Sequence, residues 1–192
     1  MLFLQSYFIN TYESIWSKHA LRLINTLLPL MAVYQNGVIE APLSARSDNC
    51  HHKQYPGPMN PSLKTGTLVG WTVVSGDAFG NASVSSSSSY WGGPFNKVGT
   101  FFLWGFAESG DPVVGQLQSS SFQASSVMSF LVSGGWDPVN LYIGLVRESD
   151  GTLLLNQTGM NDGAFIRIVW DTSSWAGEDV HLVVYDNGTA TS

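Results

Sequence analysis

The chain has 192 residues, of which 44% are hydrophobic and 12% aromatic, which is enough for one hydrophobic core of ordinary size. Only 11% of the residues are charged and the formal net charge is −6, so the chain lacks the basic surface that attracts nucleic-acid phosphates or an anionic membrane. The composition therefore argues against nucleic acid as a partner and is typical of an extracellular β-protein that contacts neutral ligands such as sugars.

The N-terminal residues predict a targeting segment. Lys18 and Arg22 precede an apolar run over residues 23–34, and the small residue Ala41 offers a cleavage point, which is the order found in secretory signals. The apolar run is too short to span a bilayer. We expect residues 1–41 to be a leader with a secretory signal and the protein to be secreted, without a stable membrane anchor. A signal anchor that is not cleaved, or an amphipathic helix, is the alternative.

Residues 42–62 are predicted to be a proline-rich linker, since residues 42–61 contain four prolines among polar residues. Cys50 is the only cysteine, so no disulfide can form within the chain. The triplet Cys50-His51-His52 could capture copper or nickel locally, but its adjacent residues do not have the spacing of a structural zinc site. We expect a disordered tail here, with no metal and no cofactor.

From residue 63 onward, short apolar runs rich in β-branched and aromatic residues are separated by Gly, Asp, Asn and Ser. In the last run Val180, Leu182 and Val184 alternate with the residues between them, a period of two that is typical of a strand with one buried face. We predict an all-β fold, a two-sheet antiparallel β-sandwich of jelly-roll, galactose-binding-like type over residues 63–192. The predicted strands are 69–74, 100–106, 116–123, 127–132, 140–147, 152–156, 165–170 and 180–185.

Two local patterns predict connections between these strands. Ser149-Asp150-Gly151 separates two strand-like runs, and Asp-Gly supplies the positive φ angles of a tight hairpin. The low-complexity run Ser85–Ser89 predicts a loop tip. Trp71, Trp104 and Trp170 fall inside predicted strands, where we expect them to be core residues, and His181 falls in an alternating strand, where a satisfied histidine is expected.

Four segments follow in order through residues 63–188: LKTGTLVGWTVVSGDAFG, GQLQSSSF, FLVSGGWDPVNLYIGLVRESDGTLLLNQTG and FIRIVWDTSSWAGEDVHLVVYDN. Together they resemble the β-sandwich accessory module of secreted glycoside hydrolase family 32 enzymes, which include inulinases, levanases and β-fructofuranosidases. The resemblance implies a non-catalytic, carbohydrate-binding-like module that accompanies a catalytic domain, with an oligo- or polysaccharide, fructan above all, as ligand. Lys64 stands where the family commonly has an acidic residue, and the closing segment of the module is missing, so we expect residues 63–192 to be incomplete at the C-terminus.

Residues 134–140, GGWDPVN, also resemble the WMNDPNG signature that carries the nucleophile of family 32 catalytic domains. However, no Asn precedes Asp137, Val139 stands where Asn-Gly should follow Pro138, and neither Arg-Asp-Pro nor Glu-Cys-Pro occurs in the chain. A retaining glycosidase needs a second carboxylate about 5 Å from the first, and none can be nominated. We therefore assign Asp137 to a turn, with Pro138 fixing φ as the chain enters the next strand, and predict that this chain is not an enzyme.

Sugar ligands are held by aromatic platforms and by amide and carboxylate side chains that form directional hydrogen bonds. The candidate contacts are Tyr90 and Trp91 in the Gly/Ser-rich loop, and Trp136, Asp137 and Asn140. Three sequons, at Asn81, Asn156 and Asn187, are candidate glycosylation sites. A structural spacer that docks to a catalytic domain and binds no ligand is the alternative function, and a complete glycosidase that uses Asp137 is the least favoured one.

Overall fold

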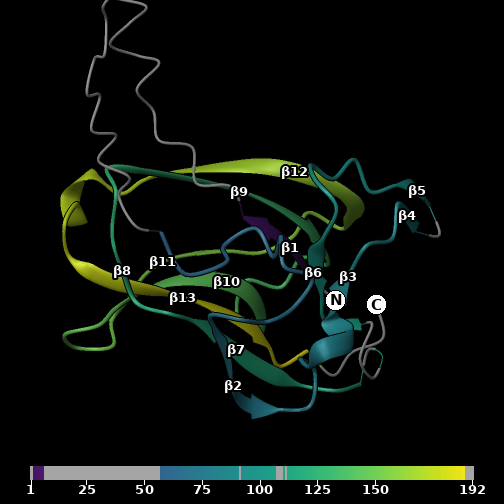
Figure 1. Cartoon of the computed structure of the whole chain (residues 1–192), viewed down its shortest axis with the longest axis horizontal. Coiled ribbons are helices and arrows are strands. Elements are labelled where there is room, and N and C mark those ends of the chain that lie inside the picture. The colour runs from purple at the N-terminus through teal and green to yellow at the C-terminus, as the bar shows by residue number, and fades with distance from the viewer. Residues whose placement is uncertain (1, 7–56, 91, 107–109, 111, 189–192) are drawn as a thin grey trace, which may run out of the picture. The chain divides into compact units, whose positions relative to one another are not determined.

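The structure is a computed structural model that describes residues 2–6, 57–90, 92–106, 110 and 112–188, with backbone alone for residues 2–6. It is all-β, and its antiparallel strands form two large sheets and one small one (Figure 1). Short 3₁₀ turns, η2 (Asn81–Ser83) and η3 (Ser173–Trp175), lie between strands. Among the described residues no helix has both the length and the apolar character needed to cross a membrane.

The first sheet has the strand order β12-β9-β1-β6-β3. The second has the order β11-β10-β13-β7-β2, with β8 paired to β13, and the third consists of β4 and β5. The strands of the first sheet are β1 (Leu2–Ser6), β3 (Val84–Ser85), β6 (Phe102–Trp104), β9 (Val127–Gly134) and β12 (Asp162–Asp171). Those of the second and third are β2 (Trp71–Gly76), β7 (Gly115–Ser119), β8 (Phe122–Gln123), β10 (Leu141–Arg147), β11 (Leu153–Gln157), β13 (Asp179–Asp186), β4 (Ser89–Tyr90) and β5 (Gly93–Pro94).

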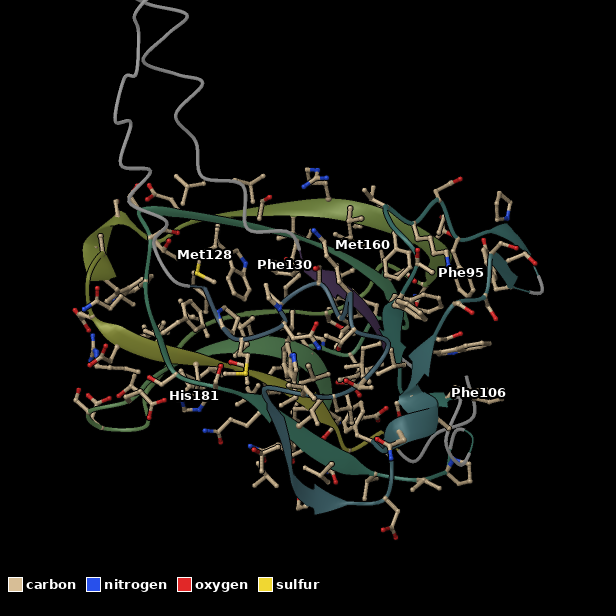
Figure 2. All side chains as sticks on the ribbon, in the orientation of Figure 1. Phe95, Phe106, Met128, Phe130, Met160 and His181 are labelled. Carbon is tan, nitrogen blue, oxygen red and sulfur yellow. The ribbon has the colours of Figure 1, made fainter. Side chains whose placement is uncertain are left out.

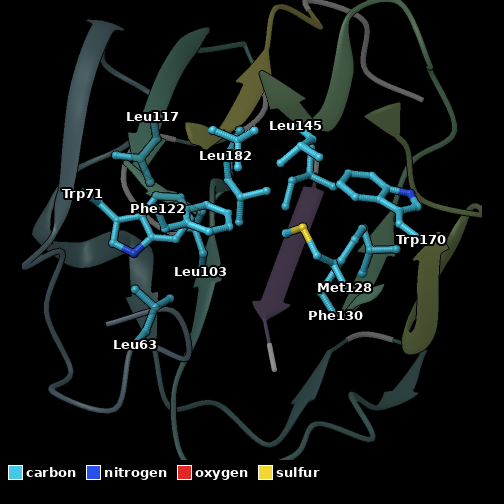
Figure 3. Packing of buried hydrophobic residues seen from close by; sticks show 14 of the residues in the cluster. Leu63, Trp71, Leu103, Leu117, Phe122, Met128, Phe130, Leu145, Trp170 and Leu182 are labelled. Atoms are coloured by element: carbon cyan, nitrogen blue, oxygen red, sulfur yellow. The ribbon is translucent and has the colours of Figure 1, made fainter. Parts of the chain in front are cut away.

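The two large sheets share one hydrophobic core. Leu103 and Met128 come from the first sheet, Leu117 and Leu182 from the second, and their side chains gather between the strands (Figure 3). Alternate residues of β13 contribute to this core, as the period of two predicted. A second cluster, which we call the aromatic cluster, consists of Phe95, Phe102, Leu131 and Phe165, with Tyr90 and Trp104 packed against it.

Seven of the eight predicted strands are each present, with ends that shift by a few residues, whereas the predicted strand 116–123 is divided into β7 and β8. The prediction of an all-β fold is confirmed for the described residues. Trp71 and Trp170 are buried in the core as predicted, whereas Trp104 is half-buried at the aromatic cluster. The Asp150-Gly151 hairpin is also confirmed, because Gly151 has φ of 69° and its N–H donates to the carbonyl of Arg147.

Two predictions, for residues 85–89 and 57–62, differ from the structure. The run Ser85–Ser89 is not a single loop tip, because Ser85 ends β3 and Ser89 begins β4. The end of the predicted linker, residues 57–62, contacts the module: the Met59 N–H donates to the Ser120 hydroxyl at 2.7 Å, and the Trp71 indole donates to the Asn60 carbonyl at 3.3 Å.

The N-terminal residues hold a place that the sequence did not predict. Leu2–Ser6 form β1, which pairs antiparallel with both β9 and β6 in the interior of the first sheet (Figure 1). The rest of the predicted leader, the triplet Cys50-His51-His52 and most of the predicted linker lie outside the described residues. A cleavage after Ala41 would remove this strand from the sheet.

Candidate functional site

The segment that was singled out by its sequence, residues 134–140, joins β9 to β10 and lies against the loop that joins β11 to β12. The Trp136 N–H donates to Asn161 Oδ1 at 2.7 Å, and the Asp137 N–H donates to the Thr158 hydroxyl oxygen at 2.9 Å. The Thr158 hydroxyl in turn donates to the Gly135 carbonyl at 3.2 Å. These bonds fix the backbone of one loop on side chains of the other.

The two loops approach one another at their backbones. A Cβ atom added to Gly159 would lie 2.3 Å from the Gly134 carbonyl oxygen, a distance that no side chain tolerates. The Asn161 N–H also donates to that Gly134 oxygen at 2.8 Å, with Asn161 itself at a positive φ of 58°. Asparagine is among the few residues other than glycine that adopt this conformation readily. The sequence Gly-Met-Asn thus permits the close contact.

Asp137 holds its own turn together, as the Asp-Pro pattern predicted. Its Oδ1 accepts the N–H groups of Val139 and Asn140 at 3.1 and 3.0 Å, and its Oδ2 accepts the Asn140 side-chain amide at 3.0 Å. The side-chain bond from Asn140, followed by its backbone N–H, lowers the pKa of Asp137 because these donors stabilise the carboxylate. Both oxygens of Asp137 are therefore engaged inside the turn.

Three apolar side chains stand exposed on this pair of loops. The Trp136 residue is 62% exposed, and Val139 and Met160 are exposed beside the same hydrogen-bonded frame. The Trp136 N–H is bonded to the Asn161 side chain, so the backbone position from which the indole projects is fixed. We call Trp136, Val139, Met160 and their supporting residues Thr158 and Asn161 the Trp136 surface.

Tyr90, the second predicted platform, is hydrogen-bonded to Asp162, the residue that follows Asn161. Its hydroxyl donates to Asp162 Oδ1 at 3.0 Å, and its ring packs on Phe95 with centroids 5.4 Å apart. The bond to Asp162 raises the pKa of Tyr90, since the carboxylate favours the protonated phenol. The Ala164 N–H, and then the Tyr90 hydroxyl, lower the pKa of Asp162.

The two predicted aromatic residues are thus hydrogen-bonded to consecutive residues at the start of β12: Trp136, through its backbone, to Asn161, and Tyr90, through its hydroxyl, to Asp162. Gly163 allows this arrangement, because a Cβ there would lie 2.2 Å from the Tyr90 ring. Trp91 lies outside the described residues. The sequence did not single out Thr158 or Asn161, and it placed Asp162 in a loop as a solvated acid and not as a site residue, although Gly159 and the polar residues around it carried a turn signal.

Two of the three sequons border the Trp136 surface. The Asn156 side-chain amide donates to the Pro138 carbonyl at 3.0 Å, and the Asn187 N–H donates to the Asn140 carbonyl at 2.7 Å. Asn156, Asn187 and the third sequon residue, Asn81 in η2, are all exposed. A glycan at Asn156 or Asn187 would therefore stand next to residues 138–140.

The ionisable groups at the other end of β10 form structural pairs. His181 is buried, with its Nδ1 2.8 Å from Glu148 Oε1, so it is a satisfied histidine as predicted. Arg147 binds Glu178 at 2.7 Å and Asp150 at 3.0 Å. In Figure 2 His181 lies well apart from Met160 of the Trp136 surface. Over the described part of the chain, no three His, Cys, Asp or Glu residues come together as metal ligands.

Comparisons of the chain with protein-family models, with curated proteins and with solved structures find no match.

Proposed function

We propose that this protein is a secreted, non-catalytic carbohydrate-binding module with a jelly-roll sandwich fold, of the kind that accompanies fructan-degrading glycoside hydrolases of family 32. The observation that carries the proposal is the exposed indole of Trp136 on a loop whose main chain is anchored by Asn161 and Thr158. An aromatic residue whose backbone is fixed before the ligand arrives loses less conformational freedom on binding than one on a free loop, so less of the contact energy is spent on ordering.

The chemistry around Trp136 suits a neutral polyhydroxylated ligand. Sugars present apolar C–H faces that stack on an indole, and hydroxyl groups that bond to amide, carboxylate and phenol groups. Asn140, Asn161, Asp162 and Tyr90 provide such groups within the same hydrogen-bonded frame. Asp137 supports this surface by holding the turn, and its engaged oxygens favour that role over nucleophilic attack.

A docking role for the same surface is the second candidate. Val139 and Met160 are exposed on the same two loops as Trp136, and exposed apolar side chains also occur where two domains pack together. In that case the module would act as a spacer for a catalytic domain and would bind no sugar.

Affinity electrophoresis of the full chain in gels that contain inulin, levan or an unrelated polysaccharide tests the proposal. We expect selective retardation by a fructan, lost in Trp136→Ala and retained in Val169→Ala. Val169 is the matched control because its exposed fraction, 62%, equals that of Trp136 and it lies toward the far end of β12.

Folded protein that migrates unretarded in all the gels would favour the spacer. Retardation that survives Trp136→Ala would move the binding site elsewhere. Release of fructose from inulin that Asp137→Asn abolishes would overturn the non-catalytic assignment.

A further inference from the structure

The position of β1 in the first sheet indicates an interaction that does not depend on sugar binding. β1 lies between the facing edges of β9 and β6, two strands that do not pair with each other. Its residues 2–6 match residues 134–130 of β9, and Phe3 and Leu4 match Trp104 and Leu103 of β6. We call the space between these two edges the β6–β9 slot.

The slot requires a strand. If it were empty, the N–H and C=O groups on the facing edges of β9 and β6 would lose their partners inside the sheet. Seven of the eight residues of β9 are buried when β1 is in place, so an empty slot would open a largely apolar edge together with unpaired backbone groups. Backbone groups left without hydrogen-bond partners destabilise the fold, so a complementary strand is favoured there.

The strands that flank the slot also define the chemistry of its occupant. Along β9, Phe130 and Val132 belong to the main core, whereas Leu131 between them belongs to the aromatic cluster. β6 alternates likewise, with Phe102 in the aromatic cluster and Leu103 in the main core. The strand that fills the slot therefore has an apolar cluster beside it on each face of the sheet, and apolar residues suit both of its alternating sets of positions. The N-terminal sequence Leu-Phe-Leu supplies such residues.

We propose that the β6–β9 slot is a strand-acceptor site that residues 2–6 of a second copy of the chain enter in place of the chain's own β1. The occupant is joined to the rest of the fold by residues 7–56 of the sequence. The contour length of that connection, at about 3.3–3.6 Å per residue, sets the upper limit of the distance over which a strand can pass between molecules. The exchanged contacts are identical to those within one chain, so the balance between the two arrangements depends on protein concentration.

Filling by the chain's own strand dominates in dilute solution, because two segments of one chain meet at an effective concentration that does not fall on dilution, whereas contact between two copies does fall. Exchange between copies is therefore expected when the chain is unfolded and refolded at high concentration. The product is a dimer, or an open chain of molecules when exchange is not reciprocal.

Cysteine cross-linking tests the slot first within one chain. In a Cys50→Ser background, two double variants are oxidised with copper phenanthroline: Leu4→Cys with Val132→Cys, and Gln5→Cys with Leu131→Cys. Successive pairs in an antiparallel ladder alternate between close and wide spacing, so one of the two has to suit a disulfide. Failure of both folded variants to cross-link would overturn the assignment of β1 to the slot.

The second stage tests the second copy as occupant. Chains that carry the β1 cysteine of the pair that cross-linked are mixed with chains that carry its β9 cysteine, refolded together at high concentration and oxidised. We expect a cross-linked heterodimer several-fold above the background given by the same β1 variant mixed with Val169→Cys chains, and a fall in its yield on dilution before refolding. Cross-linking within the chain but only background levels between chains would overturn the second copy as an occupant.

Discussion

The position of Trp136 depends on one buried hydroxyl. Thr158 is only 5% exposed, its oxygen accepts the Asp137 N–H, and its hydrogen goes to the Gly135 carbonyl. Two backbone groups of one loop are thus satisfied by a single side chain of the other. Thr158 therefore positions the loop that carries Trp136.

Replacement of Thr158 by valine removes the hydroxyl and keeps the shape of the side chain. We expect Thr158→Val to lower the free energy of unfolding by about 1–3 kcal/mol, because a buried N–H and a carbonyl lose their partner. Urea titration measures the change, with Thr72→Val, at an exposed threonine of β2, as the control that stays near the parent. Equal stability of the two variants would show that these two bonds do not support the fold.

At this scale the predictable residues were those whose partners lie nearby in sequence. The turn role of Asp137 was predictable because its acceptor oxygen reaches N–H groups only two and three residues away. Asn161 was not predictable, because its partner Trp136 lies 25 residues earlier and only the pairing of β9 with β12 brings them together. Its role depends on register, which no local pattern encodes.

Among the elements, the loops that follow β9 and β11 are packed backbone on backbone, and Gly159 is the residue that permits it. Its missing side chain leaves room for the Gly134 carbonyl oxygen, which a Cβ atom would approach to 2.3 Å. The oxygen belongs to the backbone, and the backbone fixes the position of a Cβ atom, so neither atom could move without a shift of the main chain. The spacing of the two loops, and with it the bond between Trp136 and Asn161, follows from this contact.

Gly159→Ala is therefore expected to be disruptive although alanine is small. Overpacking of this kind costs about 1–3 kcal/mol. Gly188→Ala is the matched control, since a Cβ there would come no closer than 3.7 Å to Asp186 and a surface change of this size stays within about 0.5 kcal/mol. Thermal or urea unfolding of both variants provides the measurement. A tolerated alanine at position 159 would mean that the two loops are further apart than the structure places them.

The same contrast between local and distant information separates the strands that sequence reasoning found from those it missed. The eight predicted strands have apolar residues at strand spacing between turn formers, and that signal is local. β3, β4 and β5 are two residues long and exist only through their partners. β1 was missed for a different reason: its apolar residues precede a charged and then apolar segment, a sequence that also describes a secretory leader.

At the scale of the whole molecule, the leader and β1 place opposing demands on the same residues. A leader removed after Ala41 takes β1 with it, whereas the first sheet uses β1 to join β9 to β6. If the predicted leader is removed, the β6–β9 slot needs another strand, and if β1 stays in the sheet, residues 2–6 are not removed. The predicted cleavage is thus compatible with the first sheet only if a different strand fills the slot.

Comparison of the full chain with a chain that begins at residue 42 measures this link directly. Folded domains are stable by only about 5–15 kcal/mol, and the loss of β1 leaves several buried backbone groups at about 1–3 kcal/mol each, so the shortened chain should be marginally stable. We expect a much lower urea midpoint and stronger binding of a hydrophobic dye, and both changes should be reversed in part by a synthetic peptide of residues 1–10. A peptide with Leu4→Asp is the control, because a charge has no favourable place in a strand that runs between two apolar clusters. Equal stability of the long and short chains would show that β1 is dispensable to the native sheet and would leave residues 1–41 free to act as a leader alone.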